Sequence, residues 1–142
     1  MNTLRGHCHC GNLELTMETS QPPEALAVRE CQCSFCRSHR ARATTDASGS
    51  VRIRVHAAEE LSRYRFGLRT ADFLVCKRCG NYVAAVMTAP HGRSYATVNI
   101  NVLDAAARFT QSPVAVSYDG ETEIQRRARR AKNWTPAAFS KL

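Results

Sequence analysis

Hydrophobic and polar residues alternate over several short stretches of the chain, which is the pattern of half-buried β-strands. Many of these stretches are rich in β-branched residues, and turn-forming segments separate them at residues 21–23, 47–50 and 89–92. The pattern predicts strands over residues 12–17, 41–45, 50–55, 63–68, 72–75, 83–89 and 95–100.

Helical patterns are fewer. Short ones cover residues 57–62 and 104–108, and a clearer one covers residues 121–132. Thr122 can cap the start of this last helix, and its arginines suit the negative end of the helix dipole. No repeat or long linker divides the chain. We therefore expect residues 1–142 to form one mainly β domain of short strands with a C-terminal helix.

The composition of the chain indicates its cellular compartment and the kind of chemistry that it carries. The chain has 142 residues, of which 44% are hydrophobic, and its apolar stretches are much shorter than the about 20 residues that span a bilayer. Residues 1–11 contain no apolar secretory core, so we expect a cytoplasmic protein without a membrane segment. The chain also has seven cysteines. An odd number of cysteines in a reducing compartment favours metal binding or thiol chemistry over a disulfide framework.

The cysteines fall into three tight groups, at residues 8–10 (CHC), 31–36 (CQCSFC) and 76–79 (CKRC). Cys76 and Cys79 have the two-residue spacing of zinc ligands, and Gly80 tolerates the positive φ of a tight turn. A thioredoxin-like dithiol is the alternative, but the chain lacks the βαβ pattern that accompanies it. In a strand, Cys8 and Cys10 would face the same side while His9 points away. Together, Cys8, Cys10, Cys76 and Cys79 supply the four ligands of a closed structural zinc site.

The middle group, Cys31, Cys33 and Cys36, is one ligand short of a tetrahedron. A catalytic zinc keeps three protein ligands and an open fourth position, so this group predicts a reactive site. The alternative is a second structural site completed by His39 or a partner group. The thiolate-rich ligands favour zinc, two ions per chain, although iron stays an alternative.

Three motifs resemble the family of glutathione-dependent formaldehyde-activating enzymes and centromere protein V. They are residues 6–11 (GHCHCG), 31–37 (CQCSFCR) and 73–80 (FLVCKRCG), and the resemblance continues through residues 99–104 (NINVLD) and 118–121 (YDGE). It implies a compact Mss4-like β fold, with a structural zinc on the four cysteines and a second zinc on the three. It also implies a carbon-sulfur lyase that adds glutathione to formaldehyde. Residues 37–39 (RSH) depart from the family's usual run of basic residues, and family members diverge in substrate.

A thiol that enters the open zinc position would be held as a thiolate and would attack an aldehyde carbonyl. Arg37 or His39 could stabilise the developing alkoxide, and His39 could relay a proton. Glutathione carries two carboxylates, which Arg37, Arg40 and Arg42 could bind, and Asn99 and Asn101 could line the site. Each of these polar residues also has an ordinary alternative as a solvated side chain or a partner of local backbone groups.

The chain has 20 Lys and Arg against 12 Asp and Glu, a formal net charge of +8, which two zinc ions on seven thiolates would lower to about +5. This surplus could attract nucleic acid or an anionic small molecule, and the ordinary alternative, which the charge pattern favours, is a solvated arginine-rich helix. The second functional hypothesis is a non-enzymatic zinc module whose basic helix contacts nucleic acid or a protein. The chain lacks the interleaved aromatic and basic residues of a nucleic-acid surface, which argues against nucleic acid. A third is a metal store or redox sensor with labile sulfurs. The sequence does not specify an oligomeric state.

Overall fold

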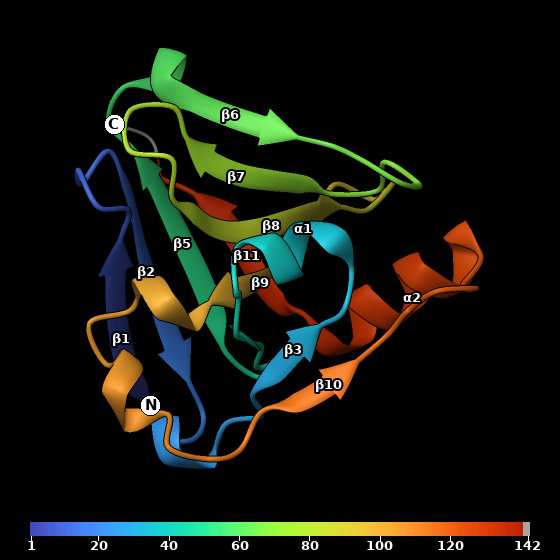
Figure 1. The fold of residues 1–142 in the computed structure, drawn as a ribbon, viewed down its shortest axis with the longest axis horizontal. Coiled ribbons are helices and arrows are strands. Elements are labelled where there is room, and N and C mark those ends of the chain that lie inside the picture. The colour runs from blue at the N-terminus through green and yellow to red at the C-terminus, as the bar shows by residue number, and fades with distance from the viewer. Residues whose placement is uncertain (141–142) are drawn as a thin grey trace.

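The computed structural model describes residues 1–140, which form one extended, strongly curved sheet with short helices at its edges (Figure 1). The strands are β1 (Asn2–His7), β2 (Leu13–Thr19), β3 (Arg29–Cys31), β4 (Ala43–Thr44), β5 (Ser50–Val55), β6 (Leu61–Tyr64), β7 (Asp72–Cys76), β8 (Tyr82–Thr88), β9 (Ser94–Asn99), β10 (Val114–Val116) and β11 (Thr135–Phe139). The α-helices are α1 (Ser34–Ser38) and α2 (Glu123–Asn133), and 3-10 turns cover Pro23–Ala25, Ala58–Glu60, Ile100–Val102 and Ala106–Arg108. The predicted mainly β class with a C-terminal helix is confirmed.

The sheet branches at β9, because one edge of this strand pairs with β8 and the other edge pairs with two strands in succession. Residues 94–96 of β9 pair with β11, and residues 98–99 pair with β4. From β11 the sheet continues through β5 and β2 to β1, and from β4 it continues through β3 to β10. On the β8 side, β7 and β6 complete a separate arm, seen at the top of Figure 1.

Strand β8 lies between two hydrophobic clusters, which is why residues 82–87 are all buried. Val83, Ala84 and Val86 belong to the main core, together with Ile53 and Val98. Tyr82, Ala85 and Met87 belong to a smaller cluster that also contains Cys36 and Trp134. The smaller cluster therefore joins the middle cysteine group to the end of α2.

The sequence pattern located several of the strands but missed other elements of the structure. The strand predicted over residues 50–55 is β5, residue for residue, whereas β1, β3, β10, β11 and α1 were not predicted. The predicted strand 41–45 shrinks to the two residues of β4, and Arg40 lies in a turn with φ 48°. Arg40 and Arg42 therefore do not share a strand face.

Helix α2 is capped as expected. The Thr122 hydroxyl accepts a hydrogen bond from the Gln125 backbone N–H at 3.1 Å, and Gln125 Oε1 accepts one from the Thr122 N–H at 3.0 Å. Helix α2 ends at Asn133, and Pro136 is the second residue of β11, where it pairs with Tyr95 of β9; β11 pairs with β5 only from Ala137 onward. No helix in residues 1–140 is long and apolar enough to cross a membrane.

Gly6 provides a test of how tightly β1 packs beside the first cysteine motif. A Cβ atom at Gly6 would lie 2.5 Å from the backbone oxygen of Val102, a contact that only a backbone shift could relieve. We predict that Gly6→Ala lowers the free energy of unfolding by about 1–3 kcal/mol, as measured by urea denaturation. Arg5→Ala, which removes an exposed side chain from the same strand, is the control and should change it little. Equal midpoints for the two variants would contradict the packing argument.

Candidate metal centres and adjoining cavity

The first cysteine group brings together two turns that are distant in the sequence. Cys8 and Cys10 follow β1, Cys76 ends β7, and Cys79 lies in the turn before β8. Their four sulfur atoms all lie within 4.8 Å of one another. The expectation that Cys8 and Cys10 converge on a strand face is wrong, because β1 ends at His7 and both cysteines lie in the turn after it.

Glycines at positive φ allow both turns to fold back on themselves. Gly11 has φ 86° and its N–H donates to the Cys8 carbonyl at 3.0 Å, while Gly80 has φ 79° and its N–H donates to the Cys76 carbonyl at 2.8 Å. A hydrogen bond of 2.6 Å from the His9 N–H to Asn81 Oδ1 joins the two turns. The cysteines are thus held in place by backbone geometry.

The spacing of these sulfurs fits a tetrahedral zinc. Sulfurs at about 2.3 Å from zinc lie about 3.8 Å apart in a tetrahedron. The Cys8 and Cys10 sulfurs are 3.7 Å apart, and those of Cys10 and Cys76 are 3.5 Å apart. Burial raises the pKa of Cys8 to about 12. At Cys79 burial also acts to raise the pKa, but backbone hydrogen bonds from Asn81 and Cys10 outweigh it and lower the pKa to about 6. The four thiols can all ionise only if a cation replaces their protons.

The second group is built on the junction between β3 and α1. Cys31 ends β3, Cys33 is the N-cap of α1, and Cys36 is buried within α1, with their sulfurs within 4.8 Å of one another. The Cys36 N–H donates to Cys33 Sγ at 3.4 Å. Hydrogen bonds from the thiols of Cys31 and Cys36 lower the pKa of Cys33 to about 2, and the same contacts raise the pKa of Cys36. The contacts within the group therefore favour ionisation of Cys33 over ionisation of Cys36.

Within residues 1–140, no fourth Cys, His, Asp or Glu ligand atom joins the three-cysteine group. His39, the suggested fourth ligand, is stacked on Phe35 with ring centroids 4.3 Å apart, and its Nδ1 lies 3.0 Å from the Phe35 carbonyl oxygen. The two cysteine groups therefore differ in the way that their spacing predicts: one offers four protein sulfurs and the other offers three.

An aromatic cluster fixes α1 against the arm of β6, β7 and β8. Phe35 lies between Cys33 and Cys36 in the sequence, and its ring packs within 4.9 Å, centroid to centroid, of Phe73 and Tyr82. This contact positions the three-cysteine loop over the arm. Two of these aromatic residues, Phe73 and Tyr82, also line a cavity beside the three-cysteine group.

A cavity of about 260 Å³ adjoins the three-cysteine group. Cys31, Cys33 and Cys36 line one side of it, Phe66, Phe73 and Tyr82 line the arm side, and arginines and Trp134 from the C-terminal segment line another. Burial raises the pKa of the Tyr82 phenol well above its usual range, so its hydroxyl remains a neutral hydrogen-bond donor. A small molecule in this cavity would contact the sulfurs, apolar walls and cations together.

The six polar residues proposed from the sequence to bind substrate lie outside the lining of this cavity. His39, Asn99 and Asn101 line a separate hollow with His9 and Asn81, and Arg37, Arg40 and Arg42 line neither. Their role in substrate binding stays a prediction.

Several of these six have partners within the protein. Asn99 is buried, and its Nδ2 donates to the Tyr82 carbonyl at 2.9 Å. Asn101 accepts from Arg42 Nε at 3.1 Å and donates to the Arg40 carbonyl at 2.9 Å. These bonds match the alternative reading in which the side chains satisfy local groups.

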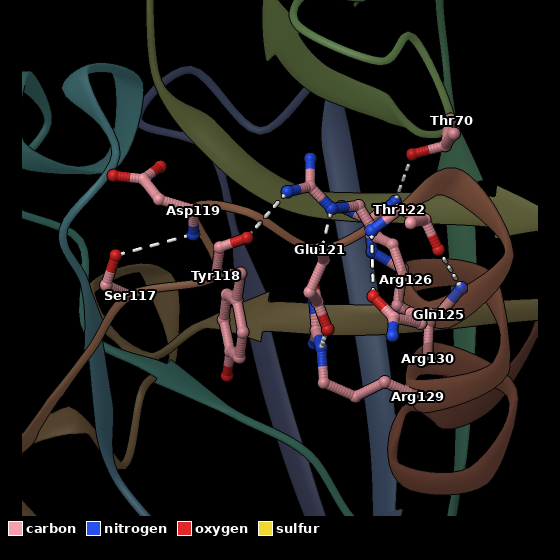
Figure 2. A network of polar contacts seen from close by, with 10 residues as sticks. All are labelled: Thr70, Ser117, Tyr118, Asp119, Glu121, Thr122, Gln125, Arg126, Arg129 and Arg130. Carbon is pink, nitrogen blue, oxygen red and sulfur yellow. Dashed lines mark hydrogen bonds and ion pairs between the residues drawn. The ribbon is translucent and has the colours of Figure 1, made fainter.

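The sequence argument missed the contribution of α2 to the cavity. Arg126, Arg129 and Arg130 line it, although the charge pattern favoured a solvated helix. Figure 2 shows Glu121 between two of them: it accepts from Arg126 at 3.3 Å and from Arg129 at 2.8 Å, and these contacts, chiefly that with Arg129, lower its pKa. The signal in the sequence that could have indicated a buried face of this helix is the single tryptophan, Trp134, which closely follows the arginines.

Comparisons with known proteins agree with the cysteine geometry. A family model described as glutathione-dependent formaldehyde-activating enzyme matches residues 3–119, a span that contains all seven cysteines. Among solved structures, the crystal structure of a Rhodobacter sphaeroides protein is similar, with 32% sequence identity and a TM-score of 0.61 over 79% of this chain and 99% of that chain. The comparison with curated proteins finds no match. The resemblance expected from the cysteine motifs is confirmed: the chain belongs to the family of glutathione-dependent formaldehyde-activating enzymes.

Proposed function

We propose that this protein is a zinc-dependent carbon-sulfur lyase, which adds the thiol of glutathione or a related small thiol to formaldehyde or another small aldehyde. The observation that carries the proposal is the difference between the two cysteine groups: the three-cysteine group adjoins a cavity and has no fourth ligand in residues 1–140. Family membership supports the reaction class. In this proposal Cys8, Cys10, Cys76 and Cys79 hold a structural zinc, and Cys31, Cys33 and Cys36 hold the catalytic one.

A bound zinc supplies Lewis acidity, which lowers the pKa of a coordinated thiol so that it is a thiolate at neutral pH. Cys31, Cys33 and Cys36 fix the place where the substrate sulfur lies. Tyr82 lines the same cavity and is the residue we assign as hydrogen-bond donor to the carbonyl oxygen. Phe66 and Phe73 exclude water from the reacting groups.

The reaction forms one bond and moves one proton. The substrate sulfur attacks the carbonyl carbon, a carbon-sulfur bond forms as the carbon-oxygen double bond becomes single, and the oxygen takes up a proton to give a hydroxymethyl thioether. The thiol loses its proton and the alkoxide gains one, so no oxidant or reductant is needed. The reverse reaction, cleavage of the carbon-sulfur bond, gives the lyase classification.

The alternative, a zinc module that contacts nucleic acid or a protein through its basic helix, receives less support. Arg126 and Arg129 share Glu121, Arg127 pairs with Glu123 at 3.2 Å, and Arg130 is buried. Most of the positive charge of α2 is therefore already paired or hidden, whereas phosphate binding needs exposed cations.

We predict that each chain binds about two zinc ions, because each cysteine group offers a thiolate site. Metal analysis of protein purified without added zinc measures the content directly. A content near one, with the three-cysteine group free of metal, would contradict the two-site proposal, and a visible iron chromophore would contradict the choice of metal.

The two sites should differ in their effect on folding. Cys79→Ser opens the closed site that joins two distant turns, so we expect unfolded or insoluble protein, a loss of about 3 kcal/mol or more. Cys33→Ser, the matched control, should keep a cooperative thermal transition and lose one zinc. Similar melting of both variants would argue against a division into structural and catalytic sites.

The thiol-binding step can be observed without turnover. We expect zinc-edge X-ray absorption to show the mean number of sulfur ligands per zinc rising from about 3.5 to about 4, each at about 2.3 Å, when glutathione is added. Cys33→Ser should show no such rise. If neither glutathione nor other small thiols change the zinc ligands of the native protein, thiol activation is not its function.

A further inference from the structure

The cavity beside the three-cysteine group has one buried cation whose charge no acidic side chain balances. Arg130 of α2 lines the cavity and is only 7% exposed. Within residues 1–140 no carboxylate oxygen lies within 4.0 Å of its guanidinium group, and its Nε has no hydrogen-bond partner. A buried, unpaired charge is destabilising unless something compensates it.

The contacts that Arg130 does make hold it in place without neutralising it. Its Nη1 donates to the Thr70 hydroxyl at 2.7 Å, as Figure 2 shows, and its guanidinium carbon lies 4.6 Å from the centre of the Trp134 ring. Burial, together with the nearby Arg129 and Arg126, lowers the pKa of Arg130 to about 10, so the group is still charged at neutral pH. Thr70 and Trp134 therefore present a fixed cation to the cavity.

The other charged residues of the cavity are engaged differently. Arg126 and Arg129 are paired with Glu121, and Arg29 donates to the Thr45 hydroxyl at 3.0 Å. Asp119 is the one acidic residue among those that line the cavity in residues 1–140, and it makes no ion pair within 4.0 Å there. The cavity thus has a surplus of positive charge, and Arg130 is its most buried cation.

Arg130 also lies outside the span that the family model matches, which ends at residue 119. A carboxylate is the complementary group, because a guanidinium binds it through two parallel, charge-assisted hydrogen bonds.

We propose that Arg130 is the specificity-determining residue of this cavity and binds a carboxylate of the molecule that reacts at Cys31, Cys33 and Cys36. The proposal rests on the proposed function for the reacting end of that molecule, which is a thiol. Its other end is a carboxylate that the guanidinium of Arg130 binds, with the apolar walls of the cavity around the chain that connects the two ends. Both glutathione and a smaller mercapto acid have this chemistry.

Trp134 makes the binding observable, because it is the protein's single tryptophan and contacts Arg130. Its fluorescence is followed while the zinc-loaded chain is titrated with 3-mercaptopropionate and with the neutral 3-mercaptopropanol. The thiol-free pair butyrate and 1-butanol is titrated in the same way. We expect each carboxylate to bind about tenfold or more tightly than its neutral counterpart. Equal binding of acids and alcohols to the native protein would overturn the proposal without any variant.

Variants then assign the preference to one residue. Arg130→Gln should abolish the preference for the acids and leave the binding of the alcohols unchanged, whereas Arg130→Lys, which keeps the charge, should retain part of it. The matched control is Arg127→Gln on the same helix, whose side chain pairs with Glu123 and does not line the cavity. This control should bind all four probes like the native protein. A preference that survives in a folded Arg130→Gln protein, as judged by its thermal transition, would overturn the assignment.

A glutathione titration of the native and Arg130→Gln proteins identifies the source of the carboxylate. Weaker binding of glutathione to the variant indicates that glutathione is the ligand, and a loss confined to 3-mercaptopropionate indicates a smaller mercapto acid. The thiol-free pair separates this proposal from the proposed function. If butyrate binding depends on Arg130 but thiols leave the zinc ligands unchanged, the carboxylate site stands and thiol activation fails.

Discussion

Seven thiols brought close together in two groups are the constraint around which this protein is organised. Thiolates repel one another, and protonated thiols at these distances can only share hydrogen bonds, so the charge of one sulfur depends on the protons of its neighbours. Within a single turn, these contacts lower the pKa of Cys33 and raise the pKa of Cys36. A divalent cation bound by the sulfurs, as we propose, would resolve this conflict between neighbouring sulfurs by replacing the protons. The fold supplies what the cation needs, which is sulfurs already positioned by backbone geometry.

The four-cysteine group and the three-cysteine group differ in which parts of the chain they connect. The four-cysteine group joins the turn after β1 to the turn between β7 and β8, so its ligands connect parts of the sheet that are far apart in the sequence. The three-cysteine group is local, lies between β3 and α1, and is held in place by Phe35. Its smaller number of ligands coincides with a cavity, and β8 separates this side of the molecule from the main core. Chemistry at the cavity therefore need not disturb the closed site.

The sequence predicted the convergence of the cysteine sulfurs into two groups because ligand spacing is local. Cys76 and Cys79 are joined by one turn, and Cys31, Cys33 and Cys36 lie within six residues, so their convergence requires no knowledge of the fold. The strand over residues 50–55 was equally accessible, since alternating burial in β5 follows the period of two. The reason given for the pairing of Cys8 and Cys10 was wrong, because a glycine turn rather than a strand brings them together.

What the sequence did not reveal depends on contacts between distant segments. The three-residue strands β3 and β10 pair with each other and are too short to show an alternating hydrophobic pattern in the sequence. Strand β11 contains Pro136, a residue that normally argues against a strand. The strand lies between β9 and β5 and pairs with both, which the sequence alone does not show. The same holds for the cavity. Nothing in the periodicity of α2 distinguishes the buried Arg130 from the other arginines of the helix, and only the position of the helix beside the three-cysteine group gives this residue its surroundings.

Anomalous diffraction at the zinc absorption edge, from crystals of the protein grown without added thiol, tests the central claim most directly. The account predicts two peaks per chain, one surrounded by the sulfurs of Cys8, Cys10, Cys76 and Cys79. The second should be bound by Cys31, Cys33 and Cys36 and complete its tetrahedron with a ligand that does not come from the protein. A single peak, or a second ion with four protein ligands, would contradict the division into a closed and an open site.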